Sequence, residues 1–128
     1  MKKLSVILFL VLLCCSCGGG SPFVAETGPF SGDFVNDNGQ SIGAFSFTVI
    51  NNVLQGTGIL NHNGDNITVT ISATVNGKVV NGSINNSTFG SGPLFGTFSN
   101  VSFVEGSFTF TGFAGINTTT GTWSASVP

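Results

Sequence analysis

The sequence ITVTISATV at residues 67–75 decides the fold class of this chain. Every odd-numbered residue of the stretch is apolar, and every even-numbered residue is Thr or Ser. This alternation is the pattern of a β-strand that has one buried face and one face in water. Residues 44–50, AFSFTVI, repeat the pattern with phenylalanine on the apolar side. The sequence therefore predicts an antiparallel, all-β domain.

Polar pairs rich in Asn and Gly separate the alternating runs, and they predict tight turns. Asn and Gly accept the positive φ angles that two-residue hairpin turns of type I′ require. Consecutive strands joined by such turns pair antiparallel. The turn sequences are Asp37-Asn38-Gly39, Asn51-Asn52, Asn63-Gly64-Asp65 and Asn76-Gly77.

The runs between the turns number eight, which is enough to close a barrel. Closure removes the exposed strand edges, and side chains can fill an eight-stranded barrel. We therefore expect an up-and-down barrel, with a two-sheet β-sandwich as the alternative. Phe is expected to fill the interior and inward Gly to let strands bend, although the same composition also suits an aromatic-lined pocket. The expected strands are 30–35, 44–50, 53–60, 67–75, 79–84, 94–100, 107–111 and 120–127.

The predicted domain resembles small barrels of the lipocalin and avidin type. The resemblance rests on the strand pattern and on Gly121-Thr122-Trp123, which is similar to a Gly-x-Trp motif of those families. Their motif lies on the first strand, whereas this one lies on the last, and Trp123 is the one tryptophan of the chain. The resemblance implies an architecture, and no ligand or residue role is transferred from it.

The N-terminus has the pattern of a signal peptide. Lys2 and Lys3 precede the apolar run LSVILFLVLL at residues 4–13, and Cys14-Cys15-Ser16-Cys17 follow. A membrane-spanning helix needs about 20 apolar residues, which is more than this run supplies.

The cysteine cluster resembles the lipobox of bacterial lipoproteins, in which a small residue precedes a cysteine that is acylated after cleavage. Ser16 precedes Cys17, and a Gly-rich stretch follows it, so Cys17 is the predicted lipidation site, with Cys15 as the alternative. This interpretation divides the chain into a signal peptide (1–16), a lipidated Cys with a flexible tether (17–27) and a barrel domain (28–128). Gly18, where Asp would imply retention in the inner membrane, implies an outer-membrane lipoprotein.

Charge and cysteine content exclude several function classes for the predicted mature domain. It keeps Lys78 alone against five carboxylates, a net charge of −4, and the chain has no Arg. Nucleic acid is therefore a poor partner, because phosphate binding needs clustered Lys and Arg. With Cys17 acylated, the domain also has no free thiol for catalysis.

Few residues could support catalysis or metal binding. His62 is expected as a solvated residue of a hairpin tip, where Asp65 could orient it. Asp37 and Asp65 lie in loops that lack the full calcium-loop pattern, so turn chemistry explains them. Glu105 is expected at a turn before the seventh strand, with an inward position as the alternative. We predict no catalytic residue, no metal and no cofactor.

The sequence therefore predicts a monomeric, non-enzymatic barrel held at the cell envelope by a lipid, with a binding or structural role. Expected partners are the membrane through its anchor and a protein, a glycan or a small apolar ligand. Two alternatives remain: a small outer-membrane barrel with its apolar face outward, and a surface-displayed hydrolase or enzyme inhibitor.

Overall fold

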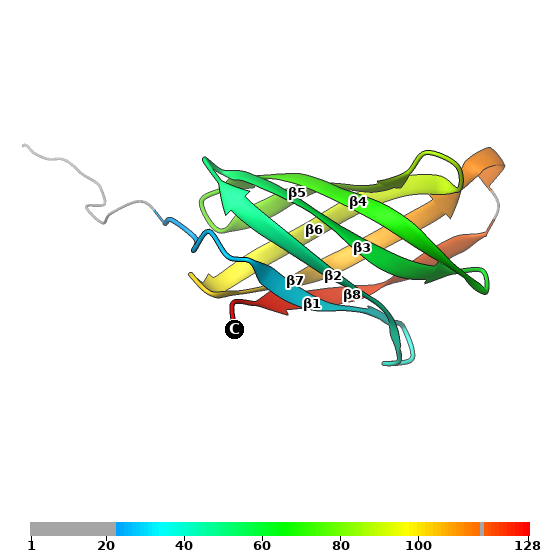
Figure 1. The fold of residues 1–128 in the computed structure, drawn as a ribbon, viewed down its shortest axis with the longest axis horizontal. Helices are drawn as coiled ribbons and strands as arrows, with labels where there is room; N and C mark the ends of the chain where they lie inside the picture. The colour runs from blue at the N-terminus through cyan, green and yellow to red at the C-terminus, as the bar shows by residue number, and fades with distance from the viewer. Residues whose placement is uncertain (1–22, 116) are drawn as a thin grey trace, which may run out of the picture.

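The chain folds into a closed barrel of eight antiparallel strands in the order β1 to β8, in which β8 pairs with β1 (Figure 1). The structure is a computed structural model, and it describes residues 23–115 and 117–128. The predicted up-and-down barrel is confirmed, and the two-sheet sandwich is wrong, because one continuous ladder closes on itself. The strands are β1 (Phe30–Asn36), β2 (Ser41–Ile50), β3 (Val53–His62), β4 (Asp65–Asn76), β5 (Val79–Asn86), β6 (Gly90–Asn100), β7 (Phe103–Gly112) and β8 (Thr118–Ser126).

All eight predicted strands are present, and several extend further than their apolar runs. β6 begins at Gly90 instead of Leu94, and β7 begins at Phe103 instead of Ser107. Glu105 therefore lies within β7 and not at a turn. Its neighbours Val104 and Gly106 face inward, so the carboxylate points outward, where water solvates it.

Two of the predicted two-residue turns have the predicted chemistry, whereas the Asn76-Gly77 turn lies one residue later, at Gly77 and Lys78, with positive φ at Gly77 alone. Asn51 and Asn52 both have positive φ, as do Asn63 and Gly64, which is the requirement of a type I′ hairpin. The β1–β2 connection is closed by Asn36, whose Oδ1 accepts hydrogen bonds from the backbone N–H groups of Asn38 and Gln40. The turns at 51–52 and 63–64 join consecutive strands, which pair antiparallel as β2 with β3 and β3 with β4.

The barrel interior is filled by apolar side chains. All five odd-numbered residues of the 67–75 stretch are buried, as the alternation predicts. Aromatic rings pack on one another across the interior: Phe34 lies 4.7 Å from Phe45 and 5.0 Å from Phe108 between ring centroids. The buried aromatic residues are Phe30, Phe34, Phe45, Phe47, Phe98, Phe108, Phe110 and Trp123. Seven phenylalanines therefore form the core as expected, whereas Phe89, Phe95 and Phe113 are exposed.

The outer wall carries mostly Thr, Ser and Asn, because the polar positions of each strand face outward. A bilayer-spanning barrel needs the reverse arrangement, with an apolar band outside. The observed orientation therefore does not fit the outer-membrane barrel that the sequence left open. Within the described ranges, no helix combines the length and the apolar character needed to cross a membrane.

Inward glycines make room for the one tryptophan. A Cβ added at Gly96 would come within 2.5 Å of Trp123 Cζ2, and Gly96 pairs with Gly106 of the next strand. The indole N–H of Trp123 donates to the carbonyl oxygens of Phe95 and Ser107, at 3.0 and 3.2 Å. The paired glycines thus allow the indole to pack close to the backbone of β6 and β7.

The two ends of the barrel differ in the chain segments that they carry (Figure 1). The end that holds residues 23–29, the turns at 51–52, 77–78 and 101–102, and the C-terminus is called the entry end. The opposite end, called the far end, holds the connections 37–40, 63–64 and 87–89, and residues 113–115 and 117 between β7 and β8. Every strand runs from one end to the other, so the two ends are separated by the full height of the barrel.

Residues 23–27, the described part of the predicted tether, lie bonded to the entry end. The backbone N–H of Glu26 donates to Val101 O, and Thr27 O accepts from the backbone N–H of Val49. The ring centroid of Phe23 lies 5.4 Å from that of Phe98, and Lys78 Nζ lies 5.7 Å from the Phe23 centroid. The point at which the chain enters the barrel is therefore held in place.

Candidate functional site

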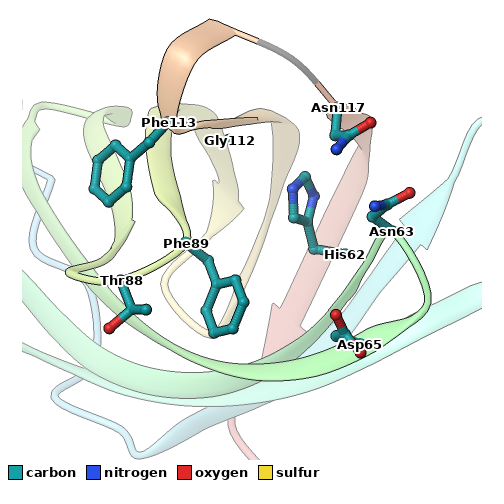
Figure 2. A pocket seen from close by; sticks show the side chains of 8 residues that line it. All are labelled: His62, Asn63, Asp65, Thr88, Phe89, Gly112, Phe113 and Asn117. Atoms are coloured by element: carbon teal, nitrogen blue, oxygen red, sulfur yellow. The ribbon is translucent and has the colours of Figure 1, made fainter.

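Three connections of the far end enclose a cleft of about 250 Å³. We call it the far-end cleft. The β3–β4 turn supplies one wall, and the β5–β6 turn and the segment between β7 and β8 supply the others (Figure 2). Its lining residues are His62, Asn63, Asp65, Thr88, Phe89, Gly112, Phe113 and Asn117.

His62 forms the floor of the cleft and is not the solvated turn residue that the sequence predicted. It is 5% exposed, and no other polar side chain in the described part of the chain is buried. Its Nδ1 lies 2.7 Å from Thr119 Oγ1, and its ring lies edge-on to Phe110 at 4.8 Å. The prediction failed because β3 continues through His62, and the alternation of that strand turns its side chain inward.

Asp65 faces His62 in the β3–β4 register, as the hairpin predicts. Nevertheless, Thr119 is the hydrogen-bond partner of the imidazole among the described residues, and Thr119 lies 57 residues away in the chain. The bond fixes the orientation of the ring. It also leaves the other ring nitrogen, Nε2, as the polar atom of His62 that could serve a bound group.

Two exposed phenylalanines border the cleft opposite His62. Phe89 is 43% exposed and Phe113 is 56% exposed. The backbone N–H of Phe113 donates to Phe89 O at 3.2 Å, so the two residues lie side by side although they belong to different connections. In Figure 2 they occupy one side of the cleft, whereas His62, Asn63, Asp65 and Asn117 gather on the other. The cleft thus has an aromatic side and a polar side.

The far end is negatively charged. Asp37 and Asp65 both lie there, and both side chains are exposed. Asp37 Oδ2 accepts a hydrogen bond from Thr120 Oγ1 at 2.7 Å, which ties the β1–β2 turn to β8. No group of three or more His, Cys, Asp or Glu side chains comes together within residues 23–115 and 117–128.

Two carboxylates that no sequence motif relates to each other lie on the same outer surface of the barrel. Asp33 of β1 and Glu105 of β7 each pair with Ser124 of β8, one on either side. Their strands are separated by two interstrand spacings, about 9.5 Å. Both side chains point outward from the convex wall, away from the far-end cleft.

The predicted lipidation site, Cys17, and its alternative, Cys15, lie outside the described residues. The described part of the chain contains no free cysteine. Sequence reasoning also missed Thr88, Phe89, Phe113, Asn117 and Thr119. They come from the β5–β6 connection and from the end of the chain between β7 and β8, and no local spacing relates these two parts to each other or to His62.

No protein-family model, no curated protein and no solved structure matches this chain.

Proposed function

We propose that this protein is a lipid-anchored, non-enzymatic barrel at the bacterial outer membrane that binds a partner protein in the far-end cleft. The anchor is Cys17, which the lipobox resemblance supports. The observation that carries the binding role is the pair of exposed phenylalanines beside a polar cleft. Large aromatic side chains that surround a desolvated pocket are typical centres of protein interfaces.

The filled interior supports binding at the surface instead of inside the barrel. Buried rings contact one another throughout the core, and they occupy the space that a lipocalin-type ligand would need. The far-end cleft, at about 250 Å³, lies below the roughly 300–1,000 Å³ typical of small-molecule sites. A cleft of this size suits one inserted side chain of a partner.

The chemistry of the cleft favours a basic side chain as the inserted group. Asp65 lines the cleft, Asp37 lies at the same end of the barrel, and the far-end connections carry no Lys or Arg. A guanidinium or ammonium group can also lie over a phenyl ring, where cation–π attraction adds about 0.5–2 kcal/mol. The proposed partner therefore presents an Arg or Lys within an apolar surface.

The anchoring part of the proposal is tested by labelling cells with radioactive palmitate. The native chain and a Cys15→Ala variant should take up label, and a Cys17→Ala variant should not. Label on Cys17→Ala would move the anchor to Cys15. Absence of label on the native chain would refute lipidation.

The binding part is tested by capture from envelope extracts with immobilised residues 23–128. We expect Phe113→Ala and Asp65→Asn each to weaken capture of the same partner about tenfold, which corresponds to about 1.4 kcal/mol. Ile59→Ala is the matched control, because Ile59 is similarly exposed but lies on the wall. A partner that all three variants retain equally does not bind in the far-end cleft.

A further inference from the structure

The entry end carries a cluster of exposed apolar side chains. Val24 is 69% exposed and Ile50 is 58% exposed, and both border a hollow of about 350 Å³ between the N-terminal segment and the β2–β3 turn. Hydrogen bonds from the backbone of residues 26 and 49 hold this segment against the barrel, so the cluster has a fixed shape. The exposed apolar residues at this end are Val24, Ile50, Val53, Val79 and Val101.

Charge is distributed unequally between this end and the rest of the barrel. The entry end has one carboxylate side chain, Glu26, and it also has Lys78, the one cationic side chain of the described residues besides the imidazole of His62. The other four carboxylates lie on the wall or at the far end. An apolar surface with a lysine is therefore opposed to a far end whose charged side chains are carboxylates.

The length of chain before the barrel limits how the barrel can sit on a membrane, if Cys17 is the anchor of the proposed function. Six residue steps separate Cys17 from Phe23, and they span at most about 20 Å. β4 has 12 residues, so its length is about 40 Å, and a strand tilt of about 40° gives a barrel about 30 Å high. The tether is shorter than the barrel, so the far end cannot turn to face the lipid.

Two orientations remain, with either the entry end or the wall against the lipid surface. The wall is built mainly of Thr, Ser and Asn, and it also bears Asp33 and Glu105. Its exposed apolar residues are Ile59 of β3 and Phe95 of β6, and Phe95 lines a hollow of the wall together with Val79 and the carboxylate-bearing Glu105. The entry end has more exposed apolar residues, two of which border one hollow, and no carboxylate side chain besides Glu26, so its contact with the headgroup region costs less free energy of desolvation.

We propose that the entry end is a membrane-contact surface, which lies in the headgroup region of the leaflet that holds the lipid anchor. Its apolar side chains enter the boundary between headgroups and acyl chains, and Lys78 lies near lipid phosphates. This contact directs the far-end cleft away from the membrane. The inference rests on the proposed anchoring, but not on the identity of any partner.

Fluorescent probes on the lipidated full-length chain test this orientation. An environment-sensitive fluorophore is attached to a cysteine introduced by Val101→Cys at the entry end, Ser87→Cys at the far end or Ile59→Cys on the wall. With Cys17 acylated, each introduced cysteine is the reactive thiol of the mature chain. The proteins are reconstituted into vesicles of phosphatidylethanolamine and phosphatidylglycerol, with and without a quencher attached to the lipid headgroup.

We expect the probe at position 101 to shift its emission to shorter wavelength and to lose intensity with the quencher. The probes at 59 and 87 should keep the emission that they have in the same protein dissolved in detergent without vesicles. Equal shifts at 59 and 101 would mean that the barrel lies on its wall, and no shift at 101 would mean that the entry end stays in water. Either result overturns the inference while the protein still floats with the vesicles.

Flotation separates failure of the anchor from failure of the orientation. A native chain that does not float with vesicles contradicts the proposed anchoring, and the membrane-contact surface with it. In a second test the probe is attached to a cysteine introduced by Val79→Cys, where we expect the same shift to shorter wavelength in vesicles. Adding Ile50→Asp and Val101→Asp together should abolish this shift. Ile59→Asp is the matched control, and it should leave the shift unchanged.

Discussion

The indole of Trp123 and the absent side chain of Gly96 form one packing unit, and a double-mutant cycle can test it. A Cβ at Gly96 would meet Cζ2 of the indole at 2.5 Å and Cη2 at 2.9 Å. Both atoms belong to the six-membered ring of the indole, and a phenylalanine at position 123 would have no atoms at these two positions. The structure therefore predicts that Trp123→Phe makes room for Gly96→Ala.

The magnitudes follow from the contacts that each change removes or adds. Trp123→Phe deletes the N–H that bonds to Phe95 O and Ser107 O and leaves a small cavity, which together cost about 2–3 kcal/mol. Gly96→Ala alone overpacks the core and costs about 1–3 kcal/mol. In the double variant the methyl group fills part of the vacated space. Its cost should fall short of the sum by about 1–2 kcal/mol, because Glu105 O, at 2.9 Å, still opposes the methyl group.

Urea unfolding of residues 23–128 measures the four free energies. Far-UV circular dichroism is the probe, because Trp123→Phe removes the one tryptophan of the chain. The m-values should stay constant, so that shifts of the midpoint report stability. Gly64→Ala combined with Trp123→Phe is the control pair, since Gly64 has no neighbour within 4 Å and the effects should add within about 0.5 kcal/mol. Additivity of the Gly96 and Trp123 changes within the same margin would refute the packing argument.

Two further predictions concern the far end. Thr119→Val removes the hydrogen-bond partner of buried His62 and should destabilise the barrel by about 1–3 kcal/mol in urea unfolding. Thr120→Val loses only an exposed hydrogen bond to Asp37 and should cost less than about 1 kcal/mol. Equal losses for the two variants would contradict a stabilising role of the buried His62–Thr119 bond. Gly64→Ala should cost about 1 kcal/mol or more because Gly64 has φ of +88°, and Gly64→Asn should recover part of that loss in thermal unfolding, since Asn tolerates the left-handed conformation. A Gly64→Asn variant no more stable than Gly64→Ala would show that conformational strain is not the cause.

The sequence alone determined the strands, their antiparallel order and the side of each strand that is buried. Residues 67–75 determine their own orientation because a period of two places all apolar side chains on one face. The Asn-rich two-residue turns determine the pairing of β2 with β3 and of β3 with β4, because so short a connection leaves no other pairing open. Both signals depend on residues close together in the chain, so they can be recognised from the sequence alone.

The same local signals misplaced His62 and Glu105. His62 stands beside Asn63-Gly64, so its neighbours in the chain indicate an exposed hairpin tip. Its burial depends on Phe110 and Thr119, which only barrel closure brings to it. Glu105 follows an apolar pair, and only its pairing with Thr97 and Ser124 shows that it belongs to a strand with its carboxylate outside.

The far-end cleft and the apolar entry end were decided by tertiary structure alone. Phe89 and Phe113 are 24 positions apart in the chain and lie on different connections, yet a backbone hydrogen bond joins them. The apolar residues of the entry end likewise come from three turns and the N-terminal segment. An up-and-down barrel gathers alternate turns at the same end, so surfaces at its two ends combine residues that no local pattern relates. This is the physical reason that the sequence predicted the barrel but not the sites that it displays.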